Sequence, residues 1–160
     1  MTPNLSTHFT VAEFVASSKA AELGIDNRLP DSLLAAARST ADMLERIREL
    51  LGARAGYTVP IKISSGYRCA ALNLAVGSGN TSDHPRAQAA DFTAASFGTP
   101  LQICRALAPL VQVLGIGQLI YECPTADRRW VHVSTRLPEK QMNRVITIGP
   151  GGPMLSIQEV

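Results

Sequence analysis

Two of the three histidines in this chain stand where, together with one aspartate, they could bind a zinc ion. His84 precedes Asp91 in the segment Ser-Asp-His-Pro-Arg-Ala-Gln-Ala-Ala-Asp, and His132 lies further on in Trp-Val-His-Val-Ser. Two imidazoles and one carboxylate leave the fourth coordination position of zinc to water, which is typical of a hydrolytic site. A histidine on an apolar strand is more often a hydrogen-bonded core residue, so the spacing alone leaves both interpretations open.

A hydrolytic zinc site also needs a base for its water, normally Glu or Asp. Residues 118–122 and 130–135 are β-rich, and seven residues separate them, which predicts a hairpin. If Glu122 pairs with Trp130, then Glu122, Trp130 and His132 lie on one face of the sheet. Glu122 is then a diagonal neighbour of His132, about 7–8 Å away between backbones, and could reach a water on the metal. Asp127 in the connecting loop is the alternative base.

Arg68 follows a short β-rich run and is the candidate for stabilising negative charge on a substrate. Its guanidinium could bind a developing oxyanion or a substrate carboxylate. Position alone favours an ordinary surface arginine.

Local patterns predict the elements that must position these residues. Thr10 and Glu13 form a capping box that begins a short helix. An apolar stripe predicts a long helix that begins at Pro30 and Asp31 and ends at Gly52. The other expected elements are a helix over 19–23, a strand over 59–64, weak helix over 69–76, an irregular loop over 77–82, a strand over 89–93, a helix from Pro100 interrupted at Pro109, and a strand over 145–148.

Composition sets the limits within which these elements assemble. The chain has 160 residues, 46% of them hydrophobic and 18% charged, which predicts one globular domain over residues 1–160 and excludes an intrinsically disordered protein. A net charge of +2 gives no argument for a nucleic-acid partner. The three cysteines are widely spaced, so we expect buried thiols rather than disulfides. We find no secretory signal and no apolar run long enough to span a membrane.

Several motifs together resemble the D-alanyl-D-alanine carboxypeptidase-like zinc peptidases. Residues 82–91 resemble the family signature S-x-H-x-x-G-x-A-x-D, and residues 130–132 resemble its W-x-H motif. Residues 65–68, Ser-Gly-Tyr-Arg, followed by Asn73, resemble an S-G-Y-R…N segment. Residues 5–13 and 24–27 resemble the start of a phage and bacterial subgroup.

This resemblance implies an α+β fold, with a small antiparallel sheet and flanking helices, shared with hedgehog signalling domains and vancomycin-resistance dipeptidases. It implies zinc bound by His84, Asp91 and His132. It also implies that Arg68 steadies the substrate carbonyl, and that Ser82 and Trp130 belong to the substrate pocket.

The sequence departs from the family pattern at two positions. Many relatives place the catalytic Glu or Asp three residues before the last histidine, where this chain has Arg129, which cannot act as a base. The phage-like subgroup instead has Glu at the end of the preceding strand, and this form selects Glu122. Ala87 replaces the usual Gly, and we expect it to narrow the loop slightly without abolishing metal binding.

The resulting hypothesis is a zinc-dependent peptidase that hydrolyses peptidoglycan stem peptides, next to D-amino acids or between L-Ala and D-Glu. We expect a monomeric, endolysin-like enzyme of phage origin, made in the cytoplasm and released to the cell wall through a holin-type pore or carried on the virion. The alternatives are a D-Ala-D-Ala carboxypeptidase or dipeptidase, and a zinc-stabilised binding or virion module without activity.

Overall fold

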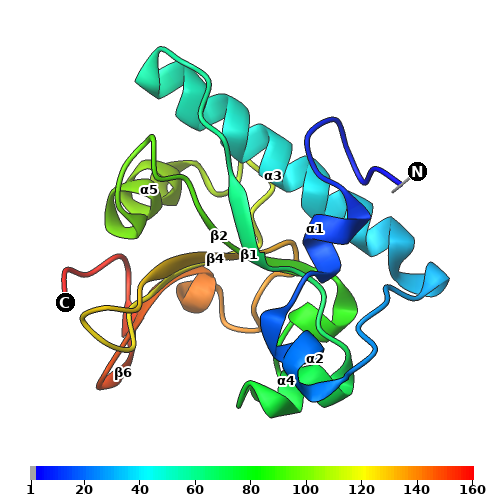
Figure 1. The fold of residues 1–160 in the computed structure, drawn as a ribbon. Coiled ribbons are helices and arrows are strands. Elements are labelled where there is room, and N and C mark those ends of the chain that lie inside the picture. Colours follow the sequence, from blue (N-terminus) through cyan, green and yellow to red (C-terminus); the bar gives the residue numbers. More distant parts are fainter. Residues whose placement is uncertain (1–2) are drawn as a thin grey trace.

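The computed structural model describes residues 3–160 and has a six-stranded sheet at its centre, with helices around it (Figure 1). The spatial order of the strands is β1-β2-β4-β3-β5-β6. Every neighbouring pair is antiparallel except β3 and β5, which are parallel. The strands are β1 (Lys62–Ser65), β2 (Ala89–Thr93), β3 (Gln118–Glu122), β4 (Trp130–Ser134), β5 (Val145–Gly149) and β6 (Gly152–Leu155).

The helices form two groups about this sheet. The α-helices are α1 (Val11–Val15), α2 (Ser18–Leu23), α3 (Leu34–Ala55), α4 (Ala70–Ala75) and α5 (Pro100–Leu107). Short 3-10 helices are η1 (Asp31–Leu33), η2 (His84–Arg86), η3 (Ala108–Leu110) and η4 (Gln141–Arg144). Helices α3 and α5 lie on one side of the sheet, whereas α2 and α4 lie together away from them (Figure 1).

Alternation along the three central strands separates an apolar face from a polar face. The side chains that face α3 and α5 are buried in the main hydrophobic cluster: Ala90, Phe92, Leu119, Tyr121, Val131 and Val133. The alternate positions point to the opposite face and carry Asp91, Glu122, Trp130 and His132. One face of the sheet therefore packs the core, and the other is free to carry a site.

The predicted long helix is confirmed, but its predicted end at Gly52 is wrong. Helix α3 continues to Ala55 and ends at Gly56, whose φ of 78° is left-handed and whose amide bonds the carbonyl of Gly52. A left-handed terminal residue is the usual role of glycine at a helix end. Gly52 stays within the helix because the residues that follow it, Ala53, Arg54 and Ala55, favour helix.

The α+β class and the hairpin predicted from the sequence are confirmed. The hairpin has the register on which the placement of Glu122 depends, with Glu122 opposite Trp130 and Ile120 opposite His132. The sheet is larger than expected and is not wholly antiparallel, since β5 adds to β3 in parallel and β6 follows it. The predicted start of the first strand at Val59 is wrong: strand β1 begins at Lys62. Pro60 has no amide hydrogen to donate to a neighbouring strand, which explains the later start. Helix α5 ends just before Pro109, as predicted.

The cysteines Cys69, Cys104 and Cys123 are free thiols in the described chain. Burial raises the pKa of the Cys104 thiol far above its usual range, so it stays protonated and packs as a small apolar group. No helix within residues 3–160 is long and apolar enough to cross a membrane.

Helix α1 begins with the predicted capping box: the Thr10 side chain accepts from the Glu13 amide, and Glu13 accepts from the Thr10 amide. This helix carries Phe14, whose side chain is fully buried, against the segment that follows β1. The backbone there passes so closely that a Cβ on Gly66 would overlap the Phe14 carbonyl oxygen and lie 2.5 Å from the Phe14 ring. Glycine is therefore required at residue 66 by space, since no Cβ fits.

We expect Gly66→Ala to destabilise the protein by about 1–3 kcal/mol, because the added methyl group overpacks a site with no room to relax. The measurement is the shift in the urea unfolding midpoint at unchanged m-value. Gly79→Ala is the control: a Cβ at residue 79 would have nothing within 4 Å, so its effect should stay within about 0.5 kcal/mol. Equal effects of the two substitutions would contradict the packing argument.

Candidate metal centre and its cleft

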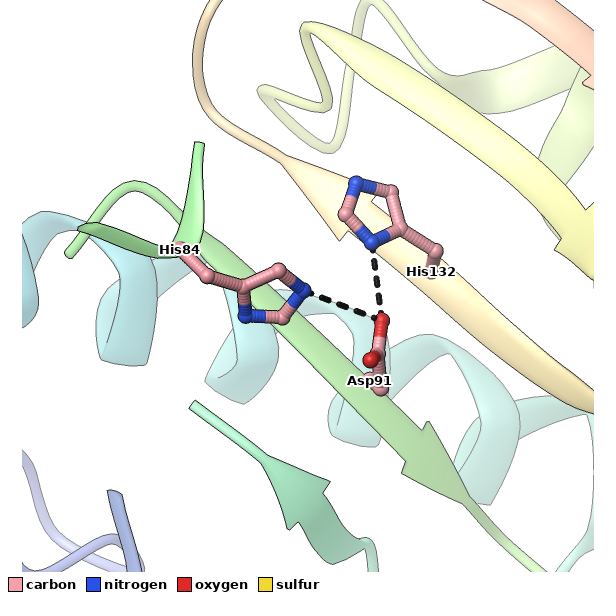
Figure 2. Close-up of side chains that lie close together, drawn as sticks. All are labelled: His84, Asp91 and His132. Carbon is pink, nitrogen blue, oxygen red and sulfur yellow. Dashed lines mark hydrogen bonds and ion pairs between the residues drawn. The ribbon is translucent and has the colours of Figure 1, made fainter. Parts of the chain in front are cut away.

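His84, Asp91 and His132 converge on the polar face of the sheet, with their side chains directed toward one another (Figure 2). Asp91 Oδ1 lies 2.8 Å from His132 Nδ1 and 3.4 Å from His84 Nε2, and the three ligand atoms all lie within 4.8 Å of one another. Donor atoms that share an ion at about 2.0–2.2 Å must lie roughly 3–4.4 Å apart. The three side chains thus fit a zinc site with small adjustments.

Strand pairing explains how two of these side chains meet. Asp91 on β2 lies directly opposite His132 on β4. Directly opposed residues of an antiparallel pair share a face with Cβ atoms about 4.5–5.5 Å apart, within contact range for a carboxylate and an imidazole. His84 comes from outside the sheet, on η2, and its ring meets that of His132 edge to face at a centroid distance of 5.2 Å.

A backbone carbonyl selects the tautomer of His84. The His84 Nδ1 atom lies 2.6 Å from the Gly66 carbonyl oxygen, which can only accept, so Nδ1 carries the hydrogen. The lone pair of the neutral ring is then on Nε2, the nitrogen that faces Asp91. A hydrogen bond from the nitrogen that does not bind the metal orients a metal-binding imidazole and increases its basicity.

The electrostatics of the cluster favour a neutral His84 beside a charged Asp91. Burial lowers the pKa of His84, so its ring is neutral at pH 7 and able to ligate. Burial alone would raise the pKa of Asp91, but the two imidazole rings beside it, those of His84 and His132, hold it well below its usual range. Burial also disfavours the charged form of His132, yet its hydrogen bond to Asp91 raises the pKa of His132 overall.

Asp83, which the sequence analysis did not single out, fixes the segment that presents His84. It is buried, and its two carboxylate oxygens accept from Ser134 Oγ at 2.7 Å and from Arg136 Nε at 2.5 Å. Ser134 is the last residue of β4, the strand of His132. The Asp83 carboxylate therefore connects the residue before His84 to β4, the strand that carries His132.

Helix α3 supports the other end of η2. Ala87 ends this turn with a left-handed φ of 56° and is fully buried, and its carbonyl accepts from Thr40 Oγ1 of α3 at 2.8 Å. A left-handed conformation is adopted most readily by glycine, which explains physically why glycine is usual at this position in the related motif. Ala87 adopts it here while His84 still points to Asp91.

The three residues lie in an open cleft of about 890 Å³ whose wall includes Glu122, Asp127 and Arg68. Glu122 ends β3 on the same face as His132 and is half-buried. Burial raises the pKa of Glu122, and the positive charges of His132 and Arg68 partly oppose the rise. Asp127 is exposed on the loop between β3 and β4, as predicted. A half-buried carboxyl with a raised pKa suits a general base better than a solvated one.

Arg68 lines the same cleft, and its Nε–H group is a hydrogen-bond donor without an acceptor in the described structure. Within residues 3–160 its buried Nε atom has no hydrogen-bond partner. Burial lowers the pKa of Arg68, while the negative charges of Asp91 and Glu122 raise it. The guanidinium is therefore available to an oxygen of a bound molecule.

Ser82 and Trp130 also line the cleft. Ser82 Oγ accepts from the His84 amide at 3.3 Å, so it caps the turn that presents the histidine. Trp130 lies opposite Glu122, and the guanidinium of Arg128 is 5.7 Å from its ring centroid. In the described part of the chain, the buried indole N–H of Trp130 has no acceptor.

Arg129 stands where many relatives have their catalytic acid, and its side chain serves the fold. It donates to Tyr121 Oη at 2.7 Å, to the Ala126 carbonyl at 3.2 Å and to the Val160 carbonyl at 3.0 Å. These bonds hold the loop between β3 and β4 and leave Glu122 as the half-buried carboxylate beside the triad.

Together, the mixed α+β sheet and a buried two-histidine, one-aspartate cluster at the floor of a cleft define a zinc-hydrolase type of protein. The family model for Peptidase M15 matches residues 7–134, which is more than half of the chain. The chain therefore belongs to the Peptidase M15 family, zinc-dependent peptidases related to D-alanyl-D-alanine carboxypeptidases. None of the curated proteins compared with the chain matches it.

We expect the purified protein to bind one zinc ion per chain and to lose it in His132→Ala and Asp91→Ala, because each removes one of three donors. Free zinc at a hundred times its Kd should stabilise the wild type by about 2.7 kcal/mol, measurable as a rise in Tm. His8→Ala is the matched control, since His8 is exposed and its ring bonds Glu45 instead. Zinc loss in His8→Ala with retention in His132→Ala would contradict this assignment.

Proposed function

We propose that this protein is a zinc-dependent peptidase that hydrolyses the stem peptides of peptidoglycan, as endolysins do. The single observation that carries the proposal is the position of the metal cluster at the floor of an open cleft, with Glu122 and Arg68 on its wall. This arrangement in a member of the Peptidase M15 family supplies each group that peptide hydrolysis needs.

A bound zinc ion supplies Lewis acidity and makes water a stronger acid. Glu122 accepts the proton of the attacking water and delivers it to the nitrogen of the leaving amine, as its raised pKa allows. Arg68 donates to the carbonyl oxygen of the scissile bond while negative charge develops there. Its free Nε and the cost of burying its charge without a partner both favour such a contact.

The cleft walls are suited to a peptide that carries charges of both signs. Lys19 from α2 and Arg128 from the β3–β4 loop lie along the cleft together with Asp127. Stem peptides carry free carboxylates next to their D-centres and an amino group in the case of a diamino acid. The open form of the cleft suits an internal segment of a chain, so we favour an endopeptidase that cuts next to D-amino acids or between L-Ala and D-Glu.

A carboxypeptidase or dipeptidase acting on D-Ala-D-Ala is the second candidate, because the motifs resemble those of such enzymes. A non-catalytic zinc module is the third, since Arg129 replaces the acid of many relatives. The position of Glu122 beside the triad argues against this third candidate. Partial burial of its carboxylate lowers stability, and ionisable groups with shifted pKa values occur most often at functional sites.

Mass analysis of muropeptide digests separates the first two candidates. We expect the zinc-loaded protein to split purified muropeptides within the stem and to release fragments of two or more residues. Release of a single D-Ala from a pentapeptide stem would identify a carboxypeptidase, and hydrolysis of the free D-Ala-D-Ala dipeptide alone would identify a dipeptidase. Unchanged masses of both substrates with zinc bound would identify a non-catalytic module. Protein treated with a chelator is the control, and activity should return with added zinc.

We expect Glu122→Gln to lower kcat by about 10²–10⁴-fold while zinc stays bound, because the amide cannot accept the proton. Asp127→Asn, the same chemical change on the rival carboxylate, should leave kcat within a few-fold of wild type. Steady-state hydrolysis of a stem-peptide substrate measures both, with zinc content determined on the same samples. If Asp127→Asn is the inactive variant, the base is Asp127 and the assignment to Glu122 is wrong.

A further inference from the structure

Asn27 is buried in the loop after α2, and its side chain binds the backbone on both sides of Arg68. The Asn27 Nδ2 group donates to the Tyr67 carbonyl at 3.0 Å and to the Val15 carbonyl at 2.8 Å. Its Oδ1 atom accepts from the Cys69 amide at 2.8 Å. Both N–H bonds and the carbonyl of this one side chain are therefore used.

These partners allow only one orientation of the carboxamide. A flipped Asn27 would place its NH₂ group against the Cys69 amide and its oxygen against two carbonyl oxygens, which are repulsive contacts. Asn27 can make both hydrogen bonds only when the Tyr67 carbonyl and the Cys69 amide have their present separation, so its side chain clamps the backbone there. That separation spans the backbone of Arg68.

The side chain of Arg68 has no comparable anchor of its own. Its Nε finds no partner in the part of the chain that the structure describes, and its guanidinium lies near the charges of Asp91 and Glu122. The direction of the side chain therefore depends on its backbone. Two further contacts hold that backbone: the Tyr67 amide donates to the Phe14 carbonyl at 2.8 Å, and the Arg68 amide approaches the His84 carbonyl at 3.4 Å.

We propose that Asn27 is a positioning residue that aims the Arg68 guanidinium into the cleft. The catalytic value of this aim rests on the function proposed above for Arg68. Asn27 does not touch the cleft itself, and it acts through the backbone of residues 67–69. A displacement of about 1 Å in a charge-stabilising group is enough to cost about 10²-fold in rate.

A double-mutant cycle on stem-peptide hydrolysis tests this role. Asn27→Ala should lower kcat about 10- to 100-fold with KM changed less than threefold and zinc content unchanged. In the Arg68→Ala background the same substitution should change kcat less than twofold, because the group that it aims is gone. Equal factors in both backgrounds would show that Asn27 acts independently of Arg68 and would overturn the proposal.

Thr147→Val is the matched control for loss of a buried clamp. Thr147 is fully buried on β5, and its hydroxyl donates to the Ser156 carbonyl at 2.9 Å and accepts from the Gln158 amide at 2.8 Å. Loss of the Thr147 hydroxyl should lower Tm but leave kcat unchanged, both in the wild type and in the Arg68→Ala variant. Asn27→Ser loses the carboxamide without adding a charge against the Tyr67 and Val15 carbonyls, so it replaces Asn27→Ala where the alanine variant does not fold.

A second readout needs no activity and separates this proposal from the proposed function. The Arg68 Nε–H signal in nitrogen-15 NMR spectra is assigned by its disappearance in Arg68→Lys. Burial should slow its exchange with water, and Asn27→Ser should speed that exchange at least tenfold while Thr147→Val does not. An inactive wild type with this exchange pattern would contradict only the proposed function. Unchanged exchange in Asn27→Ser would contradict the positioning role of Asn27.

Discussion

Asp91 on β2 lies directly opposite His132 on β4, and the candidate site depends on this pairing. Side chains alternate between the two faces of a strand, so a slip of one residue would move the carboxylate to the core and leave the imidazole on the polar face. The apolar neighbours prevent such a slip. Phe92 and Val131 are fully buried on the other face and would be exposed by it. The core therefore fixes the geometry of the cluster.

The third member of the cluster depends on polar contacts of the backbone instead. His84 lies outside the sheet, and its ring position follows from the Gly66 carbonyl, from the Asp83 carboxylate and from the left-handed turn at Ala87. Each of these contacts joins η2 to a different part of the fold: the segment after β1, the end of β4, and α3. A break in any one of them would move His84 relative to the sheet.

Much of this arrangement could be predicted from the sequence because it follows from local pattern. Two β-rich runs with a short connection predicted the hairpin, and the capping box at Thr10 predicted α1. The residues that could not be predicted act over long separations. Asp83 binds Ser134 and Arg136, and Asn27 binds Tyr67 and Cys69, and no local periodicity indicates such partners. Parallel addition of β5 to β3 is likewise a property of the assembled sheet.

Glu122 and Arg68 carry opposite charges in the same cleft, and no direct ion pair joins them among the described residues. Burial raises the pKa of Glu122 and lowers that of Arg68, so burial disfavours the charged form of each. Each group also lessens the shift of the other through its opposite charge. A direct ion pair would satisfy both and would leave neither free, whereas the Arg68 Nε has no partner among the described residues. An oxygen that enters the cleft can accept from this donor, so the arrangement favours binding of a carbonyl there.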